Sequence, residues 1–227
     1  MIKAILFDFD GTLLNRDDSV KKFIEEQYER LNQWVGHVSK EKYMTRFIEL
    51  DSGGYVWKDK VYQQLVEELE ITHVSWEDLL KDYINEYKNH CVPFPHLHDM
   101  LDELRSSDIA LGMITNGYGK FQMDNIKALG IENYFETILV SEWEGVKKPN
   151  PKIFRRALKR LNVVPSQSIF VGDHIENDIR ASENVGMKGI WKRTFQWDKA
   201  QTELMIDDLV ELPLIVREIN KKSMPSK

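Results

Sequence analysis

Two aspartates, Asp8 and Asp10, follow the first apolar run of the chain and are separated by one residue. Carboxylates at this spacing can hold a hard cation through their oxygen atoms. One of them can also attack a phosphorus atom and form an aspartyl-phosphate. Aspartate is common in turns as well, so the pair alone fits either a catalytic site or an ordinary loop.

The element that must position this pair is the run of residues 2–7, IKAILF, in which the side chains are almost all apolar. Such a run is typical of a central strand of a parallel sheet, because both faces of that strand are covered. Asp8 would then lie at the carboxyl end of the strand, where ligands bind in open α/β sheets. Gly11 would turn the chain away from the strand, so we expect a ligand site at this edge.

Three later stretches, ITNG, VKKP and VGDHIENDI, bring further polar residues to the ends of apolar runs or into the loops that follow them. Thr115 and Asn116 come at the end of a second predicted strand, so we expect them at the same sheet edge as Asp8. The candidate site residues of the three stretches are Thr115, Asn116, Gly117, Lys147, Lys148, Asp173, Asn177 and Asp178.

Together with DFDGTL, these stretches form an ordered set that resembles the four motifs of the haloacid dehalogenase-like (HAD) superfamily, and the resemblance covers the whole chain. It implies an α/β fold with a Rossmann-like parallel sheet core and an inserted small helical cap domain. It also implies a hydrolase that acts on a phosphate monoester. Asp10 supports this reaction class, since the dehalogenases of the superfamily have a different residue at its position.

The resemblance implies a role for each acidic residue. Asp8 would attack the phosphorus, and Asp10 would protonate the leaving alcohol and later accept a proton from the hydrolytic water. Mg²⁺ would bridge Asp8, the backbone carbonyl of Asp10 and Asp173. Asp178 would orient the site lysine or the water shell of the metal, and Asn177 is an alternative contact to the metal through water.

The resemblance also implies groups that bind the oxygen atoms of the transferring phosphoryl group. Thr115 would offer its hydroxyl, and the backbone amides around Asn116 and Gly117 would add further donors. Lys148 would supply positive charge for binding and catalysis, because the family motif has its lysine directly before a proline. Lys147 stays an alternative for this role.

Residues 15–92 have apolar side chains at helical spacing and predict four helices, the last of them capped by Ser75. The resemblance identifies this block as a cap domain that closes over the catalytic site, and a plain helical subdomain without motion is the alternative. The core domain would comprise residues 1–14 and 93–227, with the prolines after Val92 as the return hinge. Further strands are expected at residues 109–114, 137–140, 169–171 and 189–191.

Several residues of the expected cap could select the substrate. Four aromatic residues flank the pair Gly53-Gly54, and we expect at least two of them to pack in the core and others to contact the leaving group. A phosphomutase would need the same four motifs and a second phosphate site in the cap, for which Arg46, Lys58 and Lys60 are candidates. The four aromatic residues are Tyr43, Phe47, Tyr55 and Trp57.

The composition limits the partners of the protein. With 37 acidic and 31 basic residues, the net charge of −6 disfavours non-specific binding to nucleic acid. The sequence has no long uncharged apolar run and no signal-peptide pattern, and its single cysteine, Cys91, excludes an intrachain disulfide. We therefore expect a cytoplasmic protein without membrane association, a small-molecule phosphate ester as partner, and a monomer or weak homodimer.

Two other function classes are compatible with an aspartate at a strand end. A signalling receiver domain also phosphorylates such an aspartate, but it has the length of one small domain. A non-catalytic scaffold is disfavoured because no expected catalytic position is missing. Among phosphatases, the stretches TNGYGKFQ and SEWEGVKKPNPKIF resemble the pyrimidine nucleotidase branch, although phosphatases of sugar phosphates and glycolate phosphate are similar. A nucleoside monophosphate is the first expectation.

Overall fold

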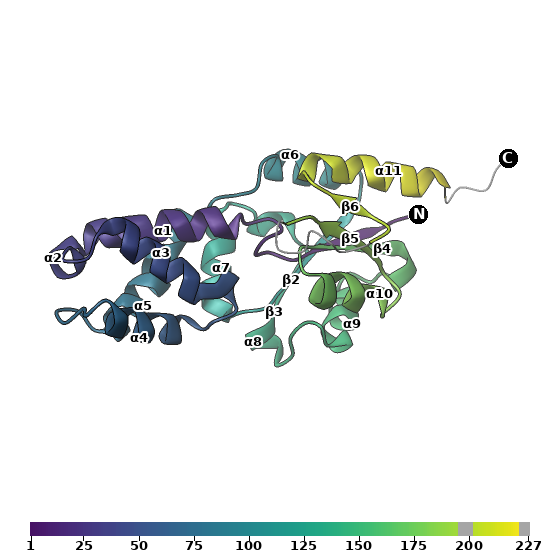
Figure 1. The fold of residues 1–227 in the computed structure, drawn as a ribbon. Coiled ribbons are helices and arrows are strands. Elements are labelled where there is room, and N and C mark those ends of the chain that lie inside the picture. The colour runs from purple at the N-terminus through teal and green to yellow at the C-terminus, as the bar shows by residue number, and fades with distance from the viewer. Residues whose placement is uncertain (195–201, 223–227) are drawn as a thin grey trace. The chain divides into compact units, whose positions relative to one another are not determined.

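The computed structural model describes residues 1–194 and 202–222. The chain divides into two compact units, an α/β unit of Met1–Asn15 and Pro93–Lys227 and a helical unit of Arg16–Val92 (Figure 1). Each unit is described separately below. Across the described parts of both, no helix combines the length and the apolar character that crossing a membrane would require.

A parallel sheet forms the centre of the α/β unit, as the sequence predicts. Over the described residues it has six strands in the order β3-β2-β1-β4-β5-β6, so β1 lies between β2 and β4. The last strand was not expected, because a two-residue strand is too short to produce a recognisable pattern. The strands are β1 (Ala4–Phe7), β2 (Ala110–Thr115), β3 (Thr137–Val140), β4 (Ser168–Gly172), β5 (Lys188–Lys192) and β6 (Met205–Ile206).

Helices cover both faces of this sheet. Figure 1 shows α6 (Leu97–Ser106) and α11 (Leu212–Lys222) on one side, and α9 (Pro151–Arg160) and α10 (Ala181–Glu183) on the other. Leu6 of β1 and Phe170 of β4 pack with Phe154 of α9 in one buried apolar cluster. Because side chains alternate along a strand, Asp8 continues the face of Leu6 at the carboxyl end of β1. The remaining helical segments of the unit are α7 (Gly119–Ala128), α8 (Ser141–Glu144), η3 (Glu132–Tyr134), η4 (Pro165–Gln167), η5 (Ile175–Arg180) and η7 (Leu209–Glu211).

The helical unit contains the four expected helices with one difference. Apolar side chains recur at helical spacing through Val35, which predicts one helix, but that helix ends at Arg30 and the chain continues after Leu31 as a separate short helix. Gln27 is fully buried in the core, where its side-chain oxygen accepts hydrogen bonds from the hydroxyls of Tyr43 and Tyr62. The helical segments are α1 (Arg16–Arg30), α2 (Asn32–Val35), α3 (Lys40–Asp51), η1 (Ser52–Gly54), α4 (Lys58–Glu68), α5 (Trp76–Glu86) and η2 (Tyr87–His90).

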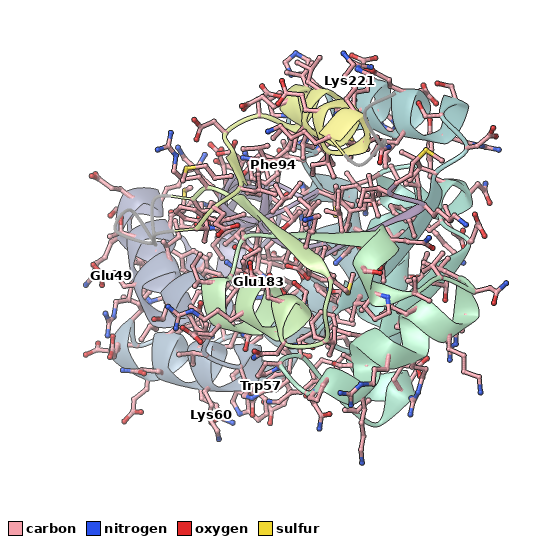
Figure 2. The ribbon with its side chains drawn as sticks, turned by 90° about the vertical axis from the view of Figure 1, so that its right-hand side faces the viewer. Glu49, Trp57, Lys60, Phe94, Glu183 and Lys221 are labelled. Carbon is pink, nitrogen blue, oxygen red and sulfur yellow. The ribbon has the colours of Figure 1, made fainter. Side chains whose placement is uncertain are left out.

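The four aromatic residues around Gly53-Gly54 divide into two groups. Tyr43 and Phe47 are fully buried in the core of the helical unit. Tyr55 and Trp57 are each 61% exposed, and Trp57 lies at the surface in Figure 2. The expectation that at least two of them pack in the core is therefore confirmed, and Tyr55 and Trp57 are the two left at the surface.

A buried carboxylate joins three elements of the helical unit. Asp51, at the end of α3, accepts a hydrogen bond from the Nη2 atom of Arg16 at 2.7 Å and pairs with Lys58 at the start of α4. Burial by itself would raise the pKa of Asp51, but the charges of Arg16 and Lys58 outweigh it and lower that pKa. Gly54 makes room for this pair, since a Cβ atom there would lie 2.8 Å from the Arg16 guanidinium.

Replacing Asp51 with Ala should lower the free energy of unfolding by about 3–5 kcal/mol, because Arg16, whose side chain is only 16% exposed, would lose its carboxylate partner. The loss should be full at neutral pH. It should shrink as the pH falls below about 4, because the folded-state pKa of Asp51 is lower than the unfolded value and the stabilisation disappears as the pH drops through it. Urea unfolding followed by circular dichroism at several pH values measures both effects.

Glu49→Ala is the matched control on the same helix. Glu49 pairs with Arg46 at the surface, and its side chain is 56% exposed (Figure 2). Loss of such a pair costs about 0–1 kcal/mol. Equal losses for the two variants would contradict a stabilising role for the Asp51 cluster.

Candidate active site

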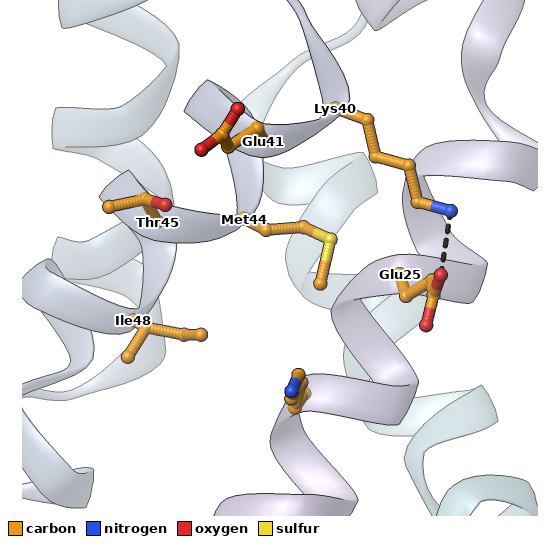
Figure 3. Close-up of a pocket in the computed structure, with 7 residues that line it drawn as sticks. Glu25, Lys40, Glu41, Met44, Thr45 and Ile48 are labelled. Carbon is orange, nitrogen blue, oxygen red and sulfur yellow. Dashed lines mark hydrogen bonds and ion pairs between the residues drawn. The ribbon is translucent and has the colours of Figure 1, made fainter.

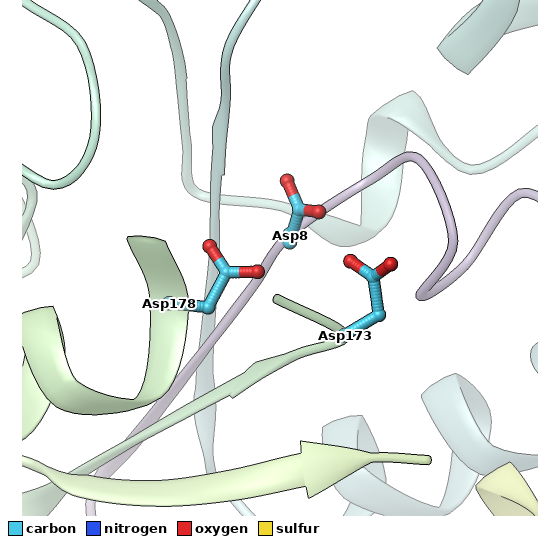
Figure 4. A group of neighbouring side chains, drawn as sticks. All are labelled: Asp8, Asp173 and Asp178. Carbon is cyan, nitrogen blue, oxygen red and sulfur yellow. The ribbon is translucent and has the colours of Figure 1, made fainter. Parts of the chain in front are cut away.

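Three carboxylates from separate motifs converge in the described part of the α/β unit. Asp8 follows β1, Asp173 follows β4, and Asp178 belongs to η5 (Figure 4). One carboxylate oxygen from each lies within 4.8 Å of the others. The pairing of β1 with β4 explains the convergence, because the amide of Asp8 donates to the carbonyl of Val171 at 2.8 Å and so aligns the two strand ends.

Two glycines allow this close approach. Gly11 has a φ of +80°, and a Cβ atom there would lie 2.4 Å from Oδ2 of Asp173. The same constraint applies at Gly172, where an added Cβ atom would lie 2.5 Å from the side chain of Asp178. Any larger residue at either position would displace a carboxylate of the cluster.

Lys148 is the lysine that reaches these carboxylates. Its Nζ atom lies 2.6 Å from Oδ1 of Asp8 and 2.7 Å from Oδ1 of Asp178, and it sits over the ring of Phe170. Burial would lower the pKa of Lys148, but the charges of Asp178 and Asp8 outweigh it and raise that pKa, so the ammonium form is kept. Lys147, the alternative from the sequence, is exposed.

Asn116 holds the backbone of Lys148. Its side-chain nitrogen donates to the carbonyl of Lys148 at 3.1 Å, and its side-chain oxygen accepts from the amide of Lys148 at 2.9 Å. The sequence suggested only a backbone contribution near this residue. The side chain therefore has a further role, because it links the end of β2 to the lysine loop.

The side chain of Asp10 contacts Gln122 of α7. The Nε2 atom of Gln122 donates to Oδ2 of Asp10 at 2.7 Å and to Oγ1 of Thr115 at 2.6 Å. Gln122 and Thr115 are both buried. Sequence reasoning missed Gln122, because one glutamine in a helical pattern is usually a solvated residue. The one available signal was its place within the TNGYGKFQ stretch.

The loop after β2 differs from expectation at Gly117. The amide of Gly117 donates to Oγ of Ser141 at 3.0 Å, and the amide of Gly119 donates to Oε2 of Glu142 at 2.6 Å. The Gly117 amide, which was expected to face the phosphoryl group, thus binds α8. These two bonds fasten the loop to the segment that follows β3.

The turn η5 is a π-helical turn, a feature that is frequent at functional sites. The Nδ1 atom of His174 accepts hydrogen bonds from the amides of Glu176 and Asn177 and so caps the turn. The amide of His174 donates to Oδ2 of Asp178 at 3.1 Å. His174 is thus used in the local structure, and Asn177 precedes Asp178 of the cluster in the same turn.

The charge balance of the site favours a bound cation. Burial, together with the charges of Asp8 and Asp178, raises the pKa of Asp173 well above its usual value. Burial also raises the pKa of Asp178 to about 6, even though Lys148 opposes the shift. The cluster therefore has more negative charge than Lys148 balances, and it offers oxygen atoms as ligands. This donor set fits a hard divalent cation such as Mg²⁺.

A hollow of about 520 Å³ lies on the helical unit (Figure 3). Lys40 at its rim already pairs with Glu25 and Glu29. The cluster of Asp8, Asp173 and Asp178 belongs to the other unit. We therefore place the candidate site by these converging charged groups and not by the size of the hollow. The hollow is lined by Lys21, Glu25, Lys40, Glu41, Met44, Thr45 and Ile48.

The cations suggested for a second phosphate site have acidic partners. Arg46 pairs with Glu49 and Glu68, and Lys58 pairs with the buried Asp51. Lys60 lies 4.0 Å from Asp59. A phosphate at these positions would have to displace a carboxylate, so the structure adds no support for a phosphomutase.

Comparison with known proteins decides the family. A family model described as haloacid dehalogenase-like hydrolase matches residues 5–192. The chain belongs to the haloacid dehalogenase-like hydrolase family. The resemblance inferred from the four motifs is confirmed, as are the α/β fold and the assignment to hydrolases.

Relatives of this HAD-like hydrolase extend the comparison. It is 32% identical to a glyceraldehyde 3-phosphate phosphatase of Pyrococcus abyssi over 84% of this chain and 81% of the relative. It is 36% identical to the pyrimidine 5'-nucleotidase YjjG of Escherichia coli over 48% of each chain. A crystal structure of a HAD phosphatase from Thermococcus onnurineus superposes with a TM-score of 0.66 at 26% identity, covering 95% of this chain and 98% of that one.

Replacing Asp173 with Asn should stabilise the metal-free HAD-like hydrolase, because it removes a charge that burial and the neighbouring carboxylates disfavour. The same change should abolish stabilisation by Mg²⁺. For the wild type, we expect that stabilisation to be about 2.7 kcal/mol at a concentration about 100 times Kd. Thermal unfolding in EDTA and in Mg²⁺ measures both effects.

Asp108→Asn is the control for this experiment. Asp108 is exposed in the turn before β2 and has a φ of 54°, which asparagine tolerates. It should show the wild-type response to Mg²⁺. If Asp173→Asn gained as much stability from Mg²⁺ as Asp108→Asn, the cation would bind somewhere other than the acidic cluster.

Proposed function

We propose that this HAD-like hydrolase is a Mg²⁺-dependent phosphatase that hydrolyses a small-molecule phosphate monoester through an aspartyl-phosphate intermediate. The observation that carries the proposal is the buried 2.6 Å contact between Lys148 and Asp8. It sets a cation against the carboxylate that would attack phosphorus, which the negative charge of a phosphate ester requires. The phosphatase and nucleotidase names of the relatives support the same reaction.

In the first half of the proposed reaction, a carboxylate oxygen of Asp8 bonds to phosphorus while the bond from phosphorus to the leaving oxygen breaks. Asp10 gives its proton to that oxygen, so the product leaves as a neutral alcohol. The hydroxyl of Thr115 donates to a phosphoryl oxygen, and Lys148 offsets the charge of the group in transfer. Asn116 and Asp178 keep Lys148 in place.

In the second half, the ionised Asp10 takes a proton from a water molecule. The water oxygen bonds to phosphorus, and the bond to Asp8 breaks to release inorganic phosphate. Asp8 and Asp173 would hold Mg²⁺ together with the backbone carbonyl of Asp10, while Asn177 is a candidate contact through water. When bound, the cation supplies further positive charge beside the phosphoryl oxygens.

Two substrate classes are supported by the relatives. The longer match, over most of the chain, is to a phosphatase of a triose phosphate. The shorter match is to a pyrimidine nucleotidase, which agrees with the nucleoside monophosphate expected from the sequence. We propose that the helical unit is the cap domain and that it selects between such substrates. The cytoplasmic location, the lack of nucleic-acid and membrane partners, and the monomer or weak homodimer stay predictions.

Phosphate release from a panel of nucleoside monophosphates, triose and sugar phosphates, glycolate phosphate and phosphoserine tests the function. Release should require Mg²⁺ and should stop in EDTA. Lys148→Ala should reduce kcat by about 10²- to 10³-fold, the usual effect of losing one group that stabilises the transition state. Lys147→Ala is the matched control and should keep nearly full activity. Equal losses for the two lysine variants would contradict the proposed site, and a panel without any hydrolysed ester would contradict the proposed function.

The roles of Asp8 and Asp10 can be separated by the leaving group. Asp8→Asn should abolish turnover of every phosphate ester, since a nucleophile is needed for each. Asp10→Asn should slow alkyl phosphates by about 10²- to 10⁴-fold, the usual effect of a positioned acid, and aryl phosphates with acidic leaving groups should lose less. Rapid-quench bursts with saturating Mg²⁺ measure the first step directly. Equal slowing of both ester classes in the burst would exclude Asp10 as the acid.

A further inference from the structure

The side chain of Gln122 lies between two residues of the proposed reaction. It is 2% exposed on α7, and its Nε2 atom lies 2.7 Å from Oδ2 of Asp10 and 2.6 Å from Oγ1 of Thr115. A side-chain amide nitrogen carries two hydrogens and accepts none. Gln122 therefore directs one donor to the proposed acid and the other to the proposed phosphoryl-binding hydroxyl.

The orientation of the amide follows from the charge of its partner. If the amide were turned by 180°, its oxygen would face an oxygen of the Asp10 carboxylate, and the two would repel each other. The ionised form of Asp10 therefore keeps the nitrogen in contact with Oδ2. Oδ2 is an acceptor in this contact, so the protonated form of Asp10 carries its hydrogen on Oδ1.

The second donor acts on Thr115 in the same manner. The Oγ1 atom of Thr115 accepts from Gln122, so the hydrogen of the hydroxyl points elsewhere and can be donated to a phosphoryl oxygen. Without Gln122, the hydroxyl could rotate and give its hydrogen to another acceptor. The side-chain amide of Gln122 thus determines in which direction Asp10 and Thr115 can each donate a hydrogen.

The surrounding loop leaves space for this side chain. Gly117 has a φ of +153°, and a Cβ atom there would lie 2.9 Å from Cγ of Gln122. Ser141 and Glu142 bind the amides of Gly117 and Gly119 and hold the loop in this position. The side chain of Gln122 therefore has a defined place between its own helix α7 and the end of β2.

We propose that Gln122 is a positioning residue that holds Asp10 with its Oδ1 proton toward the leaving oxygen and directs the Thr115 hydrogen toward the phosphoryl group. This inference rests on the proposed phosphatase function. Gln122 itself exchanges no proton: the proton passes from Oδ1 of Asp10 to the leaving oxygen as the bond to phosphorus breaks. In the second half of the reaction the same oxygen receives the proton of the attacking water.

Gln122→Met tests the proposal, because methionine has a similar length and offers no N–H donor. The measured quantity is the ratio of kcat/KM for an alkyl phosphate to kcat/KM for p-nitrophenyl phosphate, whose leaving group needs little protonation. The ratio should fall about 10-fold or more. A positioned acid contributes about 10²- to 10⁴-fold, and a misplaced one should lose part of that contribution. Both substrates are measured on one preparation, so any unfolded fraction cancels in the ratio.

Two further variants complete the experiment. Gln33→Met is a matched exposed control on α2 and should leave the ratio unchanged. In an Asp10→Asn background, Gln122→Met should change the ratio no further, because residues that act through one group are not additive. A further fall of the ratio in that background would overturn the proposal.

Equal losses of kcat/KM for both esters in Gln122→Met would also overturn the proposal, since the acid Asp10 would then act without help from Gln122. If the wild type is active in that experiment, the proposed phosphatase function still stands and only the role of Gln122 is refuted. A wild type that hydrolyses neither ester nor any member of the panel would instead overturn the proposed function and this inference with it.

Discussion

The approach of Asp8, Asp173 and Asp178 to within a few ångströms is the constraint on which the α/β unit depends. Like charges at such distances repel one another, and burial adds to the cost of keeping them ionised. The fold opposes this repulsion by several means. The strand pairing of β1 with β4 sets the backbone positions, and Gly11 and Gly172 remove the Cβ atoms that would keep the carboxylates apart.

Lys148 is the counterpart of these carboxylates, and its own position is also determined by neighbours. Asn116 binds both backbone groups of Lys148, and Phe170 supports the ammonium from below. Because Asn116 directly follows β2 and Phe170 lies in β4, the lysine loop is held to the strands on either side of β1. The loop thereby delivers the charge of Lys148 to one place, which preorganised electrostatic catalysis requires.

The ionic cluster around Asp51 and the one around Lys148 differ in their charge balance, and this difference relates to their roles. In the helical unit, Asp51 has Arg16 and Lys58 as partners, so its charge is more than compensated and its pKa is lowered. In the α/β unit, the carboxylates outweigh the lysine, and the pKa of Asp173 is raised. A compensated cluster stabilises packing, whereas an uncompensated one favours a cation or a reacting group.

Much of this protein follows from local patterns in its sequence. The apolar runs predicted five of the strands, and the polar residues that follow three of them named Asp8, Thr115 and Asp173, because strand periodicity and strand ends are encoded by adjacent residues. The resemblance to the family motif named Lys148, which lies in a loop. The tertiary structure showed that Lys148, which the motif had favoured over Lys147, is the lysine that reaches the carboxylates, and it revealed the side-chain role of Asn116. It also brought Gln122 to Asp10, which is 112 residues away in the chain. Such contacts depend on how strands pair and helices pack, and a single sequence carries no local pattern that records them.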